Sequence, residues 1–436
     1  MEPLSPTSHA FSQQESARWQ PDRRTWLQLA GAGSATWLAR VAGVLAAEAP
    51  LNLSKEPARA VILLWLAGGP SQLETFDPQP GQSIAGGTRA IETAVPGIQL
   101  AAGLPQLADQ MESISLIRSM VSKEGDHERG TYLVKSGYRP NPTLVHPSIG
   151  AICASQLPVG GTEIPRHISI LAGQWPGQGG FLGARYDAFQ MGDPRGPVPD
   201  VAPRVSKERL ERRLADLDIV QRAFAQGRAA QVKATGHRAT IAAARRMMRS
   251  DQLQAFDVSR EPQSLRDRYG DTPFGRGCLA ARRLVEVGVR CVEVTLSGWD
   301  SHVNNHAIHQ RQTGILDPAF ATLVADLRAR DLLARTVVLC GGEFGRTPQL
   351  NRLEGRDHWP HGFSMALAGG GLRGGQVVGA TDPEGSQRVA DPCPVANLHA
   401  TILTALGLDP EQETITPSGR PVKLSEGVPI DALLEG

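Results

Sequence analysis

Carboxylate and imidazole side chains are concentrated in a few short segments of this sequence, namely EGDHER, WDSH, GGEFGR and RDHWPH. Six of the eleven histidines lie in these segments or just behind them. Carboxylate oxygens and imidazole nitrogens are the ligands that hard-to-borderline divalent cations take in proteins. The pattern therefore predicts a divalent metal site, with zinc, calcium and magnesium all open, whose ligands come from Asp300, His302, Glu343, His358 and His361.

Several of these residues also have an ordinary structural interpretation. Asp300 could cap the helix that follows it, although the Asp-x-His spacing places two ligands in one loop. Glu343 could form an ion pair with Arg346, although its position among glycines at a strand end favours close approach of a ligand. His306 and His309 are expected to be surface residues of a helix.

Three further residues could act on a substrate bound to such a metal. His127 could be a general acid or base near neutral pH or, as the less favoured alternative, a covalent nucleophile. Arg346 or Arg129 could neutralise the charge that develops on ester oxygens.

The elements that must position these side chains are short apolar runs, which are continuous and therefore typical of strands buried on both faces. Segments with helical periodicity cover residues 276–287, 318–333 and 395–406. This alternation predicts an α/β fold, with a mostly parallel central sheet and helices on both faces. Ligands of such sheets bind beyond the carboxyl ends of the strands, where most of the polar segments fall. The predicted strands are residues 60–67, 114–118, 167–172, 289–296, 335–340 and 364–368.

Composition excludes several classes of protein. The 436 residues include 45 Lys and Arg against 44 Asp and Glu, a net charge of +1, which argues against a nucleic-acid binder. The five scattered cysteines lack a C-x-x-C motif, so neither a disulfide scaffold nor a zinc-finger array is indicated, and Cys291 and Cys340 are expected to be buried thiols in strands. GGPSQL follows the first apolar run in place of G-x-G-x-x-G, which disfavours a nicotinamide-dependent dehydrogenase.

The first fifty residues and one internal segment differ from the rest of the chain. Residues 1–49 combine Arg23 and Arg24, a mildly apolar run and the small-residue exit Ala47-Glu48-Ala49, which predicts a twin-arginine (Tat) signal peptide. The expected location is therefore periplasmic or secreted, with the Tat machinery as a partner and without a stable transmembrane span. Residues 50–436 form the predicted α/β domain, and the Arg- and Ala-rich residues from about 203 to 260 read as a helical insertion.

Several motifs in order give the chain a family resemblance. They are RAVILLWLAGGPSQLETFDPQPG, RSMVSKEGDHERGTYLVKSGYRPN, HPSIGAI, GGFLGARYDAF, SGWDSHVNN, GGEFGRTP and GRDHWPHGFSMALAGGGLRGG, spread from about Arg59 to Leu434. Together they resemble the exported bacterial family called domain of unknown function 1501. That family is regarded as a branch of the alkaline-phosphatase/sulfatase-like superfamily. The resemblance implies a large α/β fold with metals at the strand ends.

The resemblance carries over to individual residues only in part. It implies that His127 stands where sulfatases have a Cys or Ser nucleophile, with Ser119, Ser122 and Thr131 as nearby hydroxyls. It implies metal ligands at Asp300, His302 and Glu343 and a late metal histidine at His358 or His361. Gly68-Gly69 stands where the superfamily has metal-binding aspartates, and Glu74 and Asp77 follow a little later.

Two functions remain open from the sequence. The favoured hypothesis is an exported metal-dependent hydrolase of sulfate or phosphate esters, which uses water and not a Ser or Cys nucleophile. Its substrate would be a small ester or a sulfated or phosphorylated glycan. The alternative is a non-catalytic glycan- or envelope-binding protein on a degenerate hydrolase scaffold, which the missing aspartates and the missing nucleophile favour.

Overall fold

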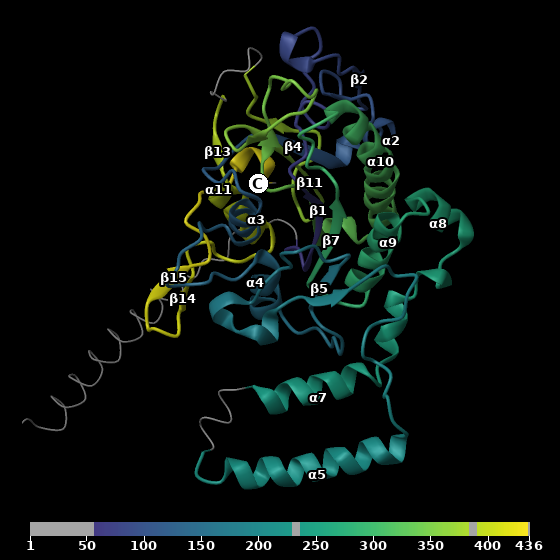
Figure 1. Ribbon diagram of the computed structural model, residues 1–436, viewed down its shortest axis with the longest axis vertical. Helices are drawn as coiled ribbons and strands as arrows, with labels where there is room; N and C mark the ends of the chain where they lie inside the picture. The colour runs from purple at the N-terminus through teal and green to yellow at the C-terminus, as the bar shows by residue number, and fades with distance from the viewer. Residues whose placement is uncertain (1–55, 229–235, 383–389, 435–436) are drawn as a thin grey trace, which may run out of the picture. The chain divides into compact units, whose positions relative to one another are not determined.

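A nine-stranded sheet runs through the part of the chain that this computed structural model describes, which is residues 56–228, 236–382 and 390–434 (Figure 1). The strand order is β12-β4-β11-β8-β1-β7-β5-β6, with β13 also beside β4. Strand β11 is antiparallel to β4 and β8, and the other pairs are parallel. The mostly parallel α/β sheet predicted from the sequence is therefore confirmed. Its strands are β1 (Ala60–Ala67), β4 (Ile114–Val121), β5 (His167–Ile170), β6 (Phe189–Met191), β7 (Cys291–Ser297), β8 (Thr336–Gly341), β11 (Phe363–Ala368), β12 (Val377–Val378) and β13 (Cys393–Pro394).

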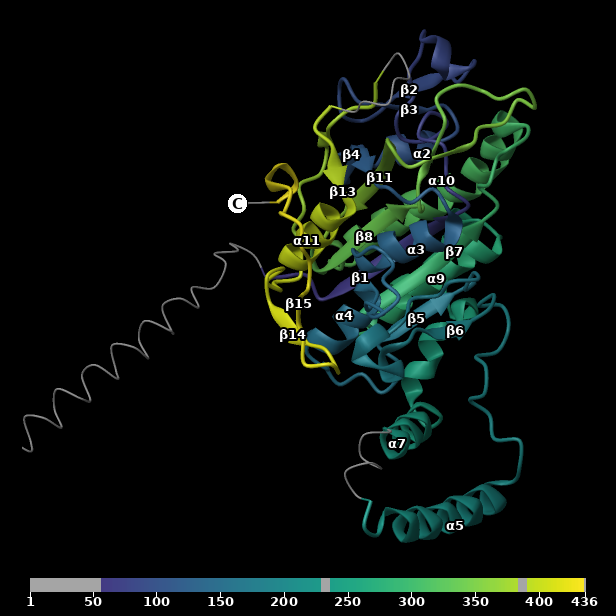
Figure 2. The ribbon, with the colours of Figure 1, turned by 60° about the vertical axis from the view of Figure 1, so that its left-hand side comes forward.

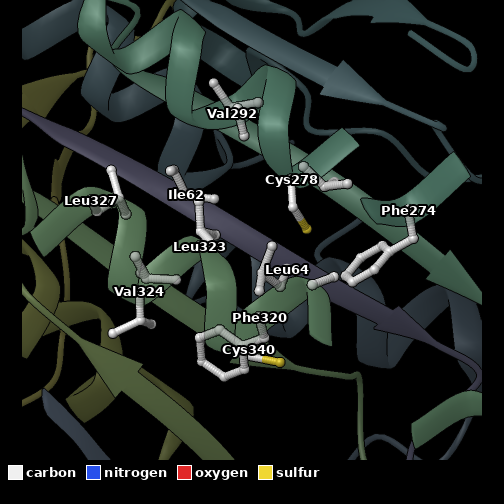
Figure 3. Packing of buried hydrophobic residues seen from close by; sticks show 14 of the residues in the cluster. Ile62, Leu64, Phe274, Cys278, Val292, Phe320, Leu323, Val324, Leu327 and Cys340 are labelled. Carbon is white, nitrogen blue, oxygen red and sulfur yellow. The ribbon is translucent and has the colours of Figure 1, made fainter. Parts of the chain in front are cut away.

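Helices cover both faces of this sheet, because its strands present apolar side chains in both directions. In β1, Ile62 and Leu64 face one buried cluster, whereas Leu63 and Trp65 face another. The first cluster includes residues of α9 (Pro273–Glu286) and α10 (Asn305–Ala329), as Figure 3 shows around Ile62 and Leu64. The second includes residues of α3 (His127–Ser136), α4 (Ile149–Gln156) and α11 (Val395–Ala405). Each fully buried aliphatic side chain of this kind contributes roughly 1.5–3 kcal/mol to folding.

Helix α10 begins earlier than its sequence pattern indicates. The pattern predicts a helix from Pro318, but the helix begins at Asn305 and contains Pro318 in its interior. Buried side chains on the preceding turns, including Thr313, Leu316 and Asp317, pack this part of the helix. Tertiary packing therefore outweighs the local helix-breaking tendency of proline.

The remaining elements are short. Three two-stranded sheets pair β2 (Ala90–Glu92) with β3 (Gln99–Ala101), β9 (Gly345–Arg346) with β10 (His358–Trp359), and β14 (Glu413–Ile415) with β15 (Pro421–Lys423). The short helix α2 (Pro105–Ala108) precedes β4 in the chain, and the short helix α8 (Gln263–Tyr269) precedes α9. The glycine-rich residues 369–375 form a turn, with positive φ at four glycines.

The segment predicted as a helical insertion contains the helices α5 (Lys207–Ala225) and α7 (His237–Met247) (Figure 2). No residue of α5 is buried, and Ile219, Val220 and Phe224 are largely exposed.

The predicted signal peptide, residues 1–49, lies outside the described residues. None of the described helices combines the length and the apolar character needed to cross a membrane. All five cysteines are buried free thiols, as expected for Cys291 in β7 and Cys340 in β8.

Candidate functional site

One edge of the sheet collects the polar segments found in the sequence. His127 is the first residue of α3, which begins after the loop that follows β4, and Asp300 and His302 lie in the loop between β7 and α10. Glu343 follows β8, and His358 lies in β10, just before β11. Since β11 is antiparallel to β8, its beginning lies at the same edge as the end of β8. The side chains therefore meet although they are far apart in the chain.

The carboxylate of Asp300 is the centre of this cluster. Its oxygens lie 3.1 Å from His302 Nε2, 3.3 Å from His358 Nε2 and 3.5 Å from His127 Nε2. His127, Asp300 and His358 each offer one ligand atom, and these atoms all lie within 4.8 Å of one another. His302 joins through Asp300 and through His358, whose Nε2 is 3.0 Å from its own Nε2. We call these four residues the His–Asp cluster.

Each imidazole of the cluster is oriented by an oxygen behind it. Carboxylate and carbonyl oxygens only accept hydrogen bonds, so a neutral ring whose Nδ1 donates to its acceptor leaves Nε2 with a lone pair. The three pairs are His127 Nδ1 with Glu343 Oε1 at 2.7 Å, His302 Nδ1 with Asp357 Oδ1 at 2.8 Å, and His358 Nδ1 with the Gly125 carbonyl at 2.8 Å.

This arrangement fits a divalent metal ion. Two Nε2 lone pairs that face each other at 3.0 Å, in His302 and His358, repel unless a proton or a cation lies between them. The carboxylate of Asp300 supplies a negative oxygen at the same place. Nδ1–H groups bound to a carboxylate or a carbonyl are also the usual surroundings of metal-binding histidines. Imidazole nitrogens and one carboxylate form a ligand set suited to zinc and related ions.

Glu343 stands behind His127. It is 1% exposed, and its Oε1 also accepts a hydrogen bond from the Gly68 amide at 2.9 Å. Its Oε2 is buried and lacks a hydrogen-bond partner within the described residues, a costly state for a carboxylate oxygen. Gly68 has a φ of +115°, and a Cβ there would lie 2.5 Å from the Asp300 amide nitrogen. A glycine at this position therefore lets the loop after β1 pass close to Asp300 and reach Glu343.

The buried guanidinium of Arg346 binds the Asp300 carboxylate. Its guanidinium is fully buried and donates to Asp300, to the carbonyls of Gly68 and Gly69, and to the Arg356 carbonyl. Burial alone would raise the pKa of Asp300, but the hydrogen bond and the charge of Arg346 outweigh it and hold this pKa below its usual value. Since its donors are used by protein groups, Arg346 positions the ligand carboxylate and does not extend toward a substrate.

The imidazoles of the cluster differ in their electrostatic surroundings. The hydrogen bond to Glu343 raises the pKa of His127, whereas burial lowers the pKa of His358. Both rings pack against the buried Phe344, with centroid separations of 5.1 Å and 4.5 Å. His127 is therefore suited to carry a proton near neutral pH, and His358 is suited to remain a neutral ligand.

Two residues of the predicted site lie elsewhere. The Nε of Arg129 is 2.7 Å from a Glu124 carboxylate oxygen, so its guanidinium is turned to that residue and not to the His–Asp cluster. His361 is exposed, and its ring centroid lies 6.4 Å from that of Trp359. Residue type and spacing alone do not reveal in which direction the side chains of Arg129 and His361 point.

Some alternative interpretations of single residues are also resolved. Asp300 does not cap the next helix, because α10 begins at Asn305 and Asn304 precedes it. The expectation of a surface position for His309 is wrong, since it is 1% exposed and its Nε2 accepts a hydrogen bond from the Ser71 amide at 2.8 Å. His306, on the same helix, is partly exposed.

The carboxylates that follow the first strand do not join the cluster. Glu74 pairs with Arg356 at 2.9 Å, and Asp77 lies 3.4 Å from Arg118. Sequence reasoning missed Asp357, which orients His302. Its position directly before His358 in DHWPH is the only sequence signal for it.

A cavity of about 270 Å³ opens beside the cluster. His127, Asp300, Glu343, Thr131 and Trp175 are among the residues that line it. A small molecule in this cavity would lie against His127, Asp300 and Glu343.

Comparisons with known proteins identify the same family as the resemblance seen in the sequence. Residues 58–434 match the family described as "Protein of unknown function (DUF1501)". No curated protein matches the sequence significantly.

Solved structures similar to this chain include the zinc complex of the C-terminal periplasmic domain of EcEptC from Escherichia coli, with 10% identity, a TM-score of 0.37 and coverage of 88% of this chain and 93% of that chain. A magnesium-bound mutant of TAB5 alkaline phosphatase has 13% identity, a TM-score of 0.37 and coverage of 81% and 99%. The PsFucS1 sulfatase from Pseudoalteromonas sp. has 14% identity, a TM-score of 0.35 and coverage of 82% and 69%.

An alkaline phosphatase and a sulfatase are thus among the similar structures, but these identities and TM-scores are too low to support a conclusion about the reaction. The family match, in contrast, spans most of the sequence. This protein therefore belongs to the DUF1501 family of proteins of unknown function.

Proposed function

We propose that this protein is a metal-dependent hydrolase of sulfate or phosphate esters. The observation that carries the proposal is the convergence of the Nε2 atoms of His302 and His358 on the carboxylate of Asp300, beside an open cavity. These three residues would hold the metal. A divalent metal bound there would polarise an ester oxygen and lower the pKa of a water molecule.

His127 is the general base in this proposal. Its Nδ1 donates to Glu343, so its Nε2 is available to exchange a proton. As the water oxygen bonds to sulfur or phosphorus, Nε2 accepts the proton of the water and later releases it to solvent. The leaving alcohol oxygen departs on the opposite side as the ester bond breaks and takes a proton from solvent. Glu343 stabilises the imidazolium that forms.

Water is the favoured nucleophile because the nearby hydroxyl groups are mostly engaged elsewhere. Ser119 Oγ donates to the Asp391 carbonyl at 2.7 Å, and Ser122 Oγ donates to the Glu124 carbonyl at 3.4 Å. Among the three hydroxyl residues considered, Thr131 is the one that lines the cavity. A Thr131→Val variant should keep turnover. Loss of turnover with normal metal content would support a covalent intermediate on Thr131 instead.

One observation favours the alternative, a non-catalytic glycan- or envelope-binding protein. Ester hydrolysis needs positive charge near the equatorial oxygens, yet the guanidinium of Arg346 is committed to protein acceptors and that of Arg129 is paired with Glu124. In the hydrolase, the metal would have to supply this charge. Metal binding without turnover of any ester would support the alternative.

The decisive experiment measures metal content and turnover together. The wild-type protein, Asp300→Ala and the control Asp216→Ala, which removes an exposed carboxylate of α5, are purified with added zinc, calcium or magnesium. Elemental analysis should find metal in the wild type and the control but not in Asp300→Ala. Turnover of aryl sulfates and aryl phosphates should follow the metal and disappear with a chelator. Unchanged metal content in Asp300→Ala would contradict the assigned site.

We also propose export by the Tat machinery, so that the enzyme acts on a small ester or a sulfated or phosphorylated glycan in the periplasm or outside the cell. The twin arginines Arg23 and Arg24 support this proposal. Replacing both with Lys should retain the protein in the cytoplasm, as cell fractionation would show. Normal export of that variant would contradict the Tat route.

A further inference from the structure

A second cavity lies along α3, next to the smaller cavity beside the His–Asp cluster. Its volume is about 470 Å³, and it shares Thr131, Lys135 and Trp175 with the smaller cavity. Thr131 and Lys135 are four residues apart and therefore lie on the same face of the helix. His127 begins this helix, so a ligand that lies along α3 reaches the cluster with one end. We call this space the α3 cavity.

The cationic side chains of the α3 cavity are already paired. Lys135 Nζ lies 2.8 Å from Glu293 Oε1, and both residues are buried, so the pair is a neutral unit. Glu124 binds both Arg129 and Arg139, each at 2.7 Å, and the exposed carboxylate of Glu128 at the lining offsets the second positive charge. The α3 cavity therefore lacks a strong attraction for anions, and the part of a ligand that it holds should be uncharged.

Aromatic surface and an unsatisfied polar group occur together in the lining. Tyr132, Trp175 and His146 contribute rings. The ring of His146 is stacked on Tyr138 with centroids 4.0 Å apart and an interplanar angle of 10°. His146 is 8% exposed, yet its Nδ1 has no hydrogen-bond partner in the described part of the chain. Buried polar nitrogens normally have a partner, so a ligand hydroxyl group would complete this position once the ring, which lines the cavity, turns its Nδ1 outward.

Flat apolar faces with hydroxyl groups at their edges are the property of a sugar ring. We propose that the α3 cavity binds a neutral carbohydrate, which forms the alcohol part of the ester held at the His–Asp cluster. The C–H faces of the sugar would pack on the rings, and its hydroxyl groups would bond to polar atoms such as His146 Nδ1. The volume lies within the range of small-molecule sites, about 300–1,000 Å³. The assignment of the ester rests on the proposed function, but binding of the sugar does not require turnover.

Calorimetric titration with neutral disaccharides tests this proposal. The probes are maltose, cellobiose, lactose and N,N′-diacetylchitobiose. At least one should bind the wild type saturably, and Trp175→Ala should weaken that binding by about 30-fold or more, as for deletion of an aromatic residue central to a binding site. His146→Phe keeps a ring against Tyr138 but removes both nitrogens, and it should weaken binding by about tenfold. Phe224→Ala deletes an exposed aromatic residue of α5 and should leave binding unchanged.

Melting curves identify any variant that does not fold. The Asp300→Ala variant tests whether carbohydrate binding in the α3 cavity is independent of metal binding at the His–Asp cluster. Asp300→Ala should lose metal but still bind the disaccharide. The proposal is overturned if no probe binds the wild type, if folded Trp175→Ala binds as tightly as Phe224→Ala, or if folded Asp300→Ala no longer binds. Disaccharide binding without any ester hydrolysis would support the carbohydrate site and refute only the hydrolase.

Discussion

Replacing Glu343 with Gln tests whether His127 transfers protons or binds the metal. Glu343 is 1% exposed, and its Oε1 accepts from His127 Nδ1 at 2.7 Å and from the Gly68 amide at 2.9 Å. Gln is nearly isosteric but removes the charge that stabilises the imidazolium. A hydrogen bond to a charged group contributes about 1.5–3 kcal/mol and a neutral one about 0.5–1.5 kcal/mol. The loss of roughly 1–1.5 kcal/mol corresponds to a decrease in kcat of about 5- to 13-fold.

Asp357→Asn is the matched control, because Asp357 has the same relation to His302, at 2.8 Å, that Glu343 has to His127. His302 is assigned as a metal ligand, and loss of the group that orients such a ligand costs about 10- to 100-fold in metal affinity or activity. The assays are kcat on an aryl ester at saturating metal and metal affinity by competition with a chelator. Glu343→Gln should lower kcat and keep metal affinity, whereas Asp357→Asn should lower metal affinity.

Two results would refute this reasoning. If Glu343→Gln weakens metal binding as much as Asp357→Asn does, His127 is a metal ligand and not the acid–base group. If Glu343→Gln changes neither kcat nor metal affinity, the hydrogen bond between Glu343 and His127 is only structural. Melting curves of both variants guard against loss of the fold.

Two further predictions concern the residues around the cluster. Gly68→Ala should lower the Tm measured by calorimetry more than Gly87→Ala does. Both glycines have positive φ, so alanine adds a backbone strain of about 1–3 kcal/mol at either position, but only at Gly68 would the new Cβ lie 2.5 Å from the Asp300 amide nitrogen. Equal decreases in Tm would contradict this reasoning. Burial raises the pKa of Glu74, but Arg356 outweighs it and the pKa is held at about 2. A lowered carboxyl pKa stabilises the fold above the unfolded pKa of about 4.3, and this contribution of about 3 kcal/mol is lost as the pH falls toward the folded pKa. Urea denaturation between about pH 5 and about pH 3 should show roughly half of this loss, and Glu74→Gln should show less of it; equal pH dependence in both proteins would argue against the pair.

The sheet is predictable from the sequence because its central strands are buried on both faces. The run AVILLWLA of β1 is apolar at every position and is buried at all but its last residue, so continuous apolar character suffices to identify it. Helix α10 is less predictable, since Pro318 is a helix-breaking residue in isolation. The side chains that hold the helix through this proline are recognisable only once their packing partners are known.

The candidate site is predictable in its residue types but less so in its geometry. Asp300, His302 and His358 stand out because they lie at strand ends, where parallel sheets bind ligands. The sequence does not indicate that Glu343 turns to His127, because this contact joins loops 216 residues apart. His361 follows His358 by three positions yet lies outside the cluster, because the direction of a loop side chain depends on the backbone and not on residue type.

The orientation of the histidines argues that the cluster is built for a cation. An accidental group of polar residues at a surface would let each imidazole turn toward solvent. Here, three acceptors from separate segments, Glu343, Asp357 and the Gly125 carbonyl, hold the three Nδ1–H groups and direct the Nε2 lone pairs toward Asp300. Converging lone pairs repel unless a proton or a cation lies between them, so without metal the cluster must either take up a proton or destabilise the fold. A bound cation would remove this repulsion, and metal should therefore raise Tm in proportion to the logarithm of its concentration above Kd.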